Sequence, residues 1–284
     1  MTWEMYRWVW CLESPIHLGI APAGVVNRTR LYVPAKTIWG ALTAEIARRE
    51  ANDKEPLYEE IGQKLQKKVR FTYLYPAEWT GQSWTAWLSS YTKERGFCWC
   101  CEDKSRDPLP DRKFRAKLLF SLPGTAIDPS SNTAEESALR EMEFICKRWR
   151  DGNYECSKVA FVGYVFFNDD SIKEQVLSIE ELFIGADTRY GFGRIELVEP
   201  PTKAAQCFGE EVILDKSDPW IKTDTVLAHV KAGNVKLMGS FELLQHWDRG
   251  KIAISGLAWS PGSFAEKKER FAVLPSGLWE FVSS

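Results

Sequence analysis

Glycine and arginine are concentrated in residues 185–194 (GADTRYGFGR), where three glycines fall within nine residues. Glycine permits positive φ and the close approach of another backbone, and exposed N–H groups in such a turn can bind a phosphate. Arg189 and Arg194 could add charge-assisted hydrogen bonds to the same anion. The segment predicts a phosphate-binding turn, although glycine content alone fits an ordinary tight turn equally well. The glycines concerned are Gly185, Gly191 and Gly193.

A second basic segment precedes a predicted helix. Arg28, Arg30 and Lys36 fall before or at its start, where the helix N-terminus itself favours an anion. Five basic residues and a single acid lie between Arg28 and Arg49. We expect the first three cations to contact a ligand, and the two arginines of the last turn to face solvent.

A third basic run includes Lys113, Arg115 and Lys117. It is a second candidate surface for RNA, but charge runs of this kind commonly just face solvent.

Nucleotide cofactors are disfavoured by the glycine-rich segment itself. No Gly-Lys-Ser/Thr follows it, as a P-loop requires. The segment is expected to end a helix and open a strand, which is the reverse of the order in a dinucleotide-binding turn. We therefore expect neither ATP nor NAD, and the sequence predicts no cofactor.

Cysteine usage leaves two interpretations open. Thiolates could hold zinc, but the spacing lacks the two residues that usually separate paired ligands, and buried free thiols are the alternative. The candidate ligands are Cys98, Cys100, Cys101 and Cys156. Seven cysteines form an odd set, which favours reduced thiols over a disulfide framework.

The composition is that of a chain that can bury a large core. Hydrophobic residues make up 44% of the 284 residues, and the formal charge is -2. Any nucleic-acid surface must therefore be a local patch. No uncharged apolar run reaches the length of a membrane span and no secretion signal precedes the first strand, so we expect a cytoplasmic protein without a membrane partner.

The elements expected to position these residues follow a repeated order. Alternation and apolar spacing predict strand, helix, strand, and later strand, helix, strand, which is the split βαβ arrangement. We therefore predict an α+β protein with a ferredoxin-like (RRM-like) βαββαβ core. The strands are expected at 3–12, 69–75, 158–167 and 192–198, and the helices at 36–52 with Thr37 as N-cap, 56–67 and 171–183.

Two further regions do not fit this core. Residues 76–156 are too long for a loop, and we expect an insertion there with a strand at 114–122 and a helix at 134–149. The core domain is then 1–200, and residues 201–284 form a C-terminal elaboration with short strands such as 251–259.

Several segments, in the expected order along the chain, resemble segments of the RAMP proteins of CRISPR type III complexes. Residues 32–42 (YVPAKTIWGAL), after a His-Leu-Gly element at 17–19, are similar to the "yIPGs-lkGalr" signature of that family. Residues 185–193 are similar to its glycine-rich loop, with Ala186 in place of a usual glycine. Residues 126–143 (AIDPSSNTAEESALREME) resemble the "aID, tgtA, gaL, E" segment of its backbone subunits.

The resemblance implies a subunit that holds CRISPR guide RNA by its backbone, next to other subunits of a type III effector complex, with an insertion that works as a thumb. Cleaving relatives carry an aspartate after the first strand, but residues 13–33 contain none, and Asn27 lies nearest to that role. We expect no target-RNA cleavage, because an amide is neither a general base nor a carboxylate metal ligand.

Two alternatives stay open. His17 could be the general base of a guide-processing endoribonuclease, the related family that also has a glycine-rich loop. A ferredoxin-like scaffold without an RNA role is the third possibility. Trp39 could stack on a base, but its apolar helical phase favours the core.

Overall fold

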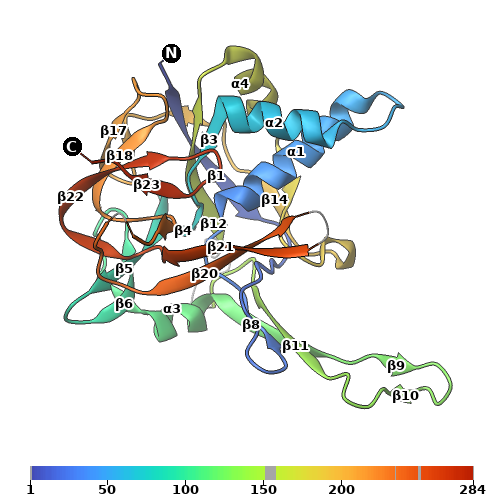
Figure 1. The fold of residues 1–284 in the computed structure, drawn as a ribbon. Helices are drawn as coiled ribbons and strands as arrows, with labels where there is room; N and C mark the ends of the chain where they lie inside the picture. The colour runs from blue at the N-terminus through green and yellow to red at the C-terminus, as the bar shows by residue number, and fades with distance from the viewer. Residues whose placement is uncertain (1, 151–157, 234, 249–250, 284) are drawn as a thin grey trace.

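The computed structural model describes residues 2–150, 158–233, 235–248 and 251–283, which form two sheets, a projecting arm and a few helices (Figure 1). The helices are α1 (Ala35–Ala51), α2 (Tyr58–Lys68), α3 (Asp111–Leu118), α4 (Asp170–Leu177) and the short 3₁₀ helix η1 (Thr188–Tyr190). The architecture is mixed α and β, and strands predominate. No helix in the described residues is both long and apolar enough to cross a bilayer.

The main sheet is built around β12, which is buried at every position. Its sequence, AFVGYVFF, is nearly continuous in apolar residues because both faces of the strand are covered. β1 pairs antiparallel with it from Glu4 opposite Phe167 to Cys11 opposite Ala160. The strands of this sheet are β1 (Glu4–Leu12), β3 (Val69–Phe71), β4 (Tyr75–Trp79), β5 (Trp84–Thr92), β6 (Gly96–Cys101), β7 (Leu109–Pro110), β12 (Ala160–Phe167), β13 (Glu181–Phe183), β14 (Arg194–Leu197) and β15 (Thr202–Lys203).

The strand order in the main sheet is β13-β14-β1-β12-β4-β5-β6-β7, with β3 also on β12 and β15 on β1. β1 is antiparallel to both β12 and β14, and β3 is antiparallel to β12. α1 and α4 contact strands of this sheet, and α1 also packs against α2.

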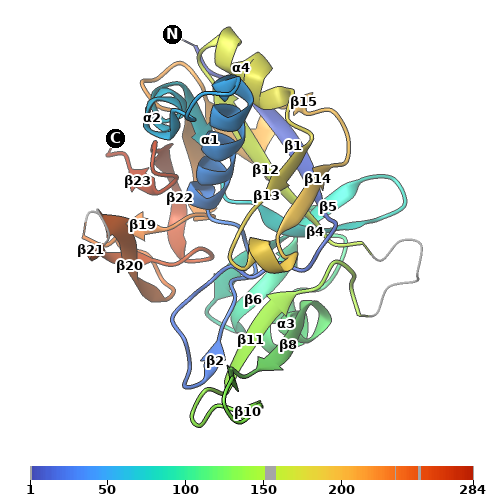
Figure 2. The same ribbon diagram turned by 90° about the vertical axis from the view of Figure 1, so that its right-hand side faces the viewer.

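The arm extends away from the body of the molecule, as Figures 1 and 2 both show. Its base is a three-stranded sheet in which β11 pairs with β8 and, in parallel, with the short strand β2 of the N-terminal loop. Its strands are β2 (Val26–Asn27), β8 (Leu119–Gly124), β9 (Ile127–Asp128), β10 (Thr133–Ala134) and β11 (Arg140–Ile145).

The C-terminal residues form a sheet of their own, in the order β16-β17-β18-β22-β23-β19-β21-β20. It packs on the main sheet through buried rings and hydrogen bonds. Phe208 meets Tyr164 edge-on at 4.9 Å, and the Tyr75 hydroxyl donates to the carbonyl of Leu227 at 2.9 Å. Its strands are β16 (Gln206–Cys207), β17 (Glu210–Ile213), β18 (Trp220–Thr225), β19 (Val230–Lys231), β20 (Phe241–Asp248), β21 (Lys251–Trp259), β22 (Phe264–Val273) and β23 (Trp279–Phe281).

Most of the elements predicted around the core are confirmed with small shifts, but two details are wrong. Thr37 is not the N-cap of α1, because the helix already begins at Ala35 after Pro34, which makes no side-chain cap. The strand expected at 69–75 is divided into β3 and β4. Between them Leu74 exchanges backbone hydrogen bonds with Val33, so this stretch pairs with the N-terminal loop.

Three other predictions fail where tertiary pairing outweighs local pattern. The helix expected at 171–183 ends at Leu177, because residues 181–183 pair with β14 as β13. The strand expected at 114–122 begins as helix α3, in which Phe114 and Leu118 are buried one turn apart. The helix expected at 134–149 is replaced largely by β11, whose backbone pairs with β8 along its length.

Candidate nucleic-acid interface

The glycine-rich turn docks directly on the chain that follows β1. The N–H of Gly193 donates to the carbonyl of Pro15 at 2.7 Å, and that of Ala186 donates to the carbonyl of His17 at 2.9 Å. The N–H of Arg194 donates to Oγ of Ser14 at 2.9 Å. Two segments about 170 residues apart in the sequence therefore lie side by side.

Two glycines make this close approach possible. Gly193 has φ +81°, and a Cβ there would lie 1.9 Å from the carbonyl oxygen of Ile184. Gly185 has φ +84°, and its Cβ would lie 2.5 Å from the carbonyl oxygen of His17. Gly191 also has a positive φ, but a Cβ there would meet open space. Any other residue at position 185 or 193 would force the backbones apart.

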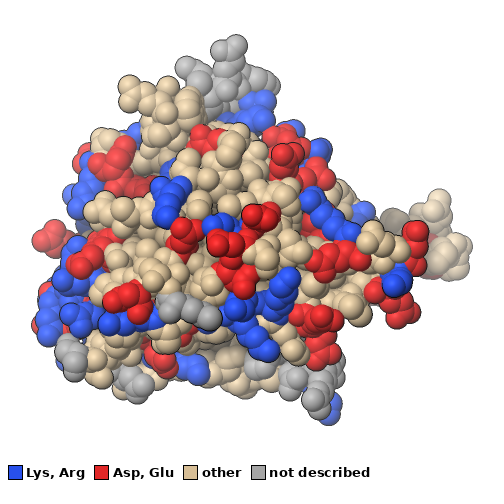
Figure 3. Space-filling view, turned by 90° about the horizontal axis from the view of Figure 1, so that it is seen from above, with Lys and Arg blue, Asp and Glu red and all other residues tan. Residues whose placement is uncertain are grey.

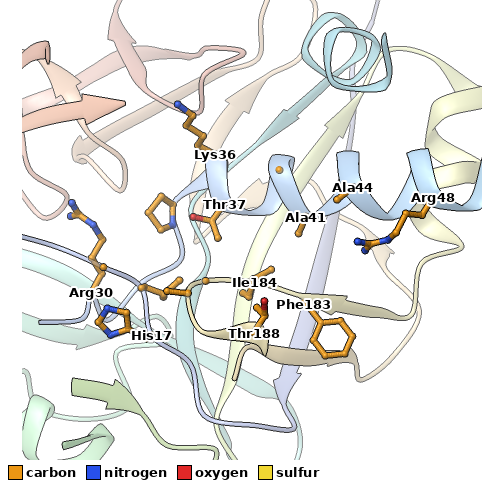
Figure 4. A pocket seen from close by; sticks show the side chains of 16 residues that line it. His17, Arg30, Lys36, Thr37, Ala41, Ala44, Arg48, Phe183, Ile184 and Thr188 are labelled. Carbon is orange, nitrogen blue, oxygen red and sulfur yellow. The ribbon is translucent and has the colours of Figure 1, made fainter. Parts of the chain in front are cut away.

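A cleft of about 550 Å³ separates this turn from α1. Ala41 and Ala44 of α1 face Phe183, Ile184 and Thr188 across it (Figure 4). Small side chains on this stripe of the helix leave the space open. The lining residues are His17, Leu18, Gly19, Arg30, Pro34, Lys36, Thr37, Gly40, Ala41, Ala44, Arg48, Phe183, Ile184, Gly185, Ala186 and Thr188.

The charged side chains that line the cleft among the described residues are all basic. Arg30, Lys36 and Arg48 line it, and no described Asp or Glu does. Lys36 is exposed on the first turn of α1 and forms no ion pair with any described residue. Arg48 pairs with Glu45, three residues earlier on the exposed side of the helix. An exposed ion pair of this kind is weak, so Arg48 remains available to a stronger anion.

Arg30, in contrast, is held in a buried network. Its guanidinium pairs with the carboxylate of Glu242 on β20 and donates to the Tyr32 hydroxyl at 3.0 Å. Nε2 of His229 lies 3.0 Å from the same carboxylate, and Nδ1 of His229 lies 2.8 Å from the Tyr73 hydroxyl. Arg30 therefore anchors the N-terminal loop to the C-terminal sheet.

The pKa values of this network follow from burial and pairing. Burial disfavours the charged form of Glu242, but hydrogen bonds from Arg30 and His229 outweigh it and lower the pKa of the carboxyl to about 2. Burial would lower the pKa of Arg30, and the pairing with Glu242 raises it instead. Burial lowers the pKa of His229, so the ring is neutral near pH 7.

His17 is buried at the inner end of the cleft. Its Nδ1 lies 2.6 Å from the carbonyl of Glu143 in the arm, so Nδ1 donates a hydrogen bond to this oxygen. The carboxylate of Glu143 also accepts the N–H of Thr29 at 3.2 Å. Glu143 thus holds both sides of the N-terminal loop against the base of the arm.

The family model of the RAMP superfamily matches residues 12–196, about two thirds of the chain and including both walls of the cleft. This chain belongs to the RAMP superfamily. None of the curated proteins matches the sequence significantly.

Among solved structures, this RAMP protein resembles a chain of the cryo-EM structure of the Type III-B Cmr-beta bound to cognate target RNA and AMPPnP, in state 1. The TM-score is 0.55 at 12% identity, over 92% of this chain and 86% of that one. A chain of the Type III-B Cmr-beta bound to cognate target RNA gives 0.43 at 10% identity, over 68% and 96%. The first likeness concerns the fold.

Three arginines predicted to bind a ligand do not line the cleft of the RAMP protein. The guanidinium of Arg28 donates to the carbonyl of Ala21 at 2.9 and 3.0 Å. Arg194 pairs with Glu181 and Glu196 on the edge of the main sheet. Arg189 is exposed on η1, outside the lining. Of the predicted cations, only Arg30 and Lys36 line the cleft together with residues of the glycine-rich turn.

The predicted basic surface at Lys113, Arg115 and Lys117 lies on α3 and does not line the cleft. Arg115 pairs with Asp111 one turn earlier, at 2.8 Å. On the face seen from above in Figure 3, where α2 and α4 lie uppermost in Figure 1, acidic and basic side chains are mixed. This agrees with a net charge near zero.

The cysteines predicted as possible zinc ligands are only partly together. Sγ of Cys98 and Sγ of Cys100 lie 4.0 Å apart on β6, whereas Cys101 contacts Ser105. Cys156 lies outside the described residues. Burial raises the pKa of both Cys98 and Cys101 to about 11, which favours the protonated thiols. Within the described part of the chain, three metal-binding side chains are nowhere grouped.

Sequence reasoning missed part of the site. Gly40, Ala41, Ala44 and Arg48 follow one another at helical spacing and form the α1 wall, so the small-residue stripe was a readable signal. Arg48 is exposed, as the sequence predicts, but it also lines the cleft. Trp39, the candidate for stacking on a base, packs between α1 and α2, where its Nε1 donates to the carbonyl of Gly62 at 3.0 Å.

Proposed function

We propose that this RAMP protein is a guide-RNA-binding subunit of a type III CRISPR effector complex and that it does not cleave the target strand. The observation that carries the proposal is the cleft between α1 and the glycine-rich turn. Its described lining residues include no Asp or Glu, and Lys36 at its rim has no ion-pair partner among the described side chains. Backbone recognition suits a guide whose sequence varies, because phosphate contacts carry no sequence information. As part of such a complex, the protein acts in the cytoplasm against foreign nucleic acid.

The core of this proposal is a ferredoxin-like domain. Support comes from the strand order β14-β1-β12-β3, antiparallel throughout, with α1 following β1 and α4 following β12. We assign residues 1–200 to this domain, residues 76–156 to an insertion within it and residues 201–284 to a C-terminal elaboration. The arm of the insertion is then the thumb that contacts neighbouring subunits or bases.

The proposed absence of cleavage rests on the cleft lining. Neither the described lining residues of the cleft nor residues 13–33 offer an aspartate that could bind a metal ion or accept a proton from the attacking hydroxyl. Incubation of the assembled complex with target RNA and Mg²⁺ is expected to leave the strand uncut at this subunit's position. A cut that disappears on Asn27→Ala would contradict the assignment.

A charge reversal tests RNA binding. Lys36→Glu is expected to weaken binding of a repeat-derived guide RNA roughly tenfold or more, and replacement by Ala to lower the slope of log Kd against log salt by about 1, because one phosphate contact is lost. Filter binding at several salt concentrations measures both. Lys113→Glu on α3 is the matched control, since it makes the same charge change away from the cleft. Equal weakening by the two reversals would contradict the proposal.

The second candidate function is a metal-free guide-processing endoribonuclease. It is favoured by the position of His17, which lines the cleft and whose Nδ1 is already engaged with the carbonyl of Glu143. Repeat-containing RNA is incubated with wild type and His17→Ala in the absence of metal. Cutting that needs His17 would replace the non-catalytic assignment, whereas RNA binding without cutting supports it.

A further inference from the structure

A second cavity continues from the cleft onto the C-terminal sheet. It has a volume of about 530 Å³ and shares with the cleft the residues Gly19, Arg30, Pro34, Lys36 and Thr37. The two cavities are therefore halves of one groove that crosses the N-terminal end of α1. Lys36 stands where they join and points from α1 toward the C-terminal strands (Figure 4).

The C-terminal wall of this groove has a different chemistry from the first half. Its side chains are hydroxyl and amide groups, two leucines and the imidazole of His229, and its described residues include neither Asp nor Glu. Arg30 offers no free charge there, because Glu242 already neutralises it. Its residues are His229, Leu244, Gln245, Ser255, Ser276 and Leu278.

A bulge in β20–β21 builds this wall. The pairing shifts between Leu244 and Gln245, so that Leu244 lies opposite Gly256 and Gln245 opposite Ile254. Consecutive residues of a regular strand point to opposite faces, but here both line the cavity. The exposed amide of Gln245 is thereby presented to the groove and can both donate and accept a hydrogen bond.

We propose that the C-terminal sheet binds the ribose 2′-hydroxyls of the RNA strand that runs past Lys36, and so distinguishes RNA from DNA. The inference rests on the proposed guide-RNA function and adds a role for residues beyond the family match at 12–196. Neutral amides and hydroxyls cannot neutralise a phosphate, but they match a group that is both donor and acceptor. The 2′-hydroxyl is the group that separates RNA from DNA at a given site.

The test compares two strands with the same bases, oligouridylate and oligodeoxyuridylate, on the full-length protein. Wild type is expected to bind the ribose strand more tightly. Gln245→Ala combined with Ser276→Ala should weaken binding of the ribose strand by about fivefold for each hydrogen bond lost, and leave the deoxyribose strand unchanged. Lys36→Ala is the matched control, because loss of a phosphate contact weakens both strands equally and keeps their ratio.

Each possible result of this test either supports or overturns the inference. A wild type that binds both strands equally, or a double variant that keeps the wild-type ratio, would overturn the inference while leaving the guide-RNA function intact. A wild type that binds neither strand would overturn the proposed function, and with it this inference. Urea unfolding midpoints equal to wild type confirm that the variants fold, and the two positions are suited to substitution because both side chains are exposed.

Discussion

The cleft beside α1 and the helix α3 carry comparable positive charge in the sequence, but they use it differently. In the cleft, Lys36 is unpaired among the described residues, and its neighbours come from the N-terminal loop, α1 and the glycine-rich turn. On α3 the cations lie on a single helix, and Arg115 is neutralised by Asp111. The difference teaches that convergence of distant backbones, rather than charge density, separates a candidate site from a solvated surface.

The largest expected effect comes from breaking the convergence without changing charge. Gly193→Val should lower the free energy of unfolding by about 4 kcal/mol, because a Cβ would lie 1.9 Å from a backbone carbonyl at φ +81°. Urea unfolding measures the change. RNA binding should fall with it if the turn shapes the cleft.

The control is Gly191→Ala in the same turn. Its φ is also positive, but a Cβ there meets nothing within 4 Å, so the cost should be only about 1 kcal/mol. Equal destabilisation by the two substitutions would mean that the close approach at Gly193 is unimportant.

The next largest effect is expected from the ion pair at the cleft, compared with the ion pair on α3. Glu242→Gln should lower the free energy of unfolding by about 3 kcal/mol, because it leaves the largely buried charge of Arg30 uncompensated. Asp111→Asn, which removes the half-exposed partner of Arg115, should cost about 0.5 kcal/mol or less. Chemical denaturation of both variants gives the comparison, and a smaller cost for Glu242→Gln than for Asp111→Asn would refute it.

The residues of the cleft were easier to predict from the sequence than the ion pairs. Lys36 and the glycines could be predicted because local features mark them: a helix start and a run of glycines. The partner of Arg30 could not, because Glu242 lies 212 residues away on a hairpin whose role no local pattern indicates. The ion pair of Arg194 could not be predicted for a related reason, since strand pairing brings Glu181 beside it.

The same division applies to the fold. Strands β1 and β12 and helix α1 were predictable because burial imposes alternation or helical spacing on their own residues. The arm was not. Residues 140–145 contain Glu, Met and Phe, which fit a helix as well as a strand, and pairing with β8 decides between them.

The smallest expected effect is the pH dependence of the Arg30–Glu242 pair. The pKa of Glu242 is about 2 in the folded protein and 4.5 without its partners, so in acid the unfolded chain binds the extra proton. The stabilisation is complete above pH 4.5 and is lost as pH falls toward 2. His229 acts in the same direction below 6.5, because burial lowers its pKa.

The stability gap between wild type and Glu242→Gln should therefore narrow in acid, by about 1 to 2 kcal/mol between neutral pH and pH near 3. Urea unfolding of the two proteins at a series of pH values measures the gap, and other carboxylates cancel in the difference. The gap between wild type and Asp111→Asn should stay nearly constant, because that pair contributes little at any pH. The contrary result is a difference in free energy of unfolding between wild type and Glu242→Gln that stays constant with pH. That result would show that the partners of the Glu242 carboxylate stabilise its ionised form no more than Arg115 stabilises that of Asp111 on α3.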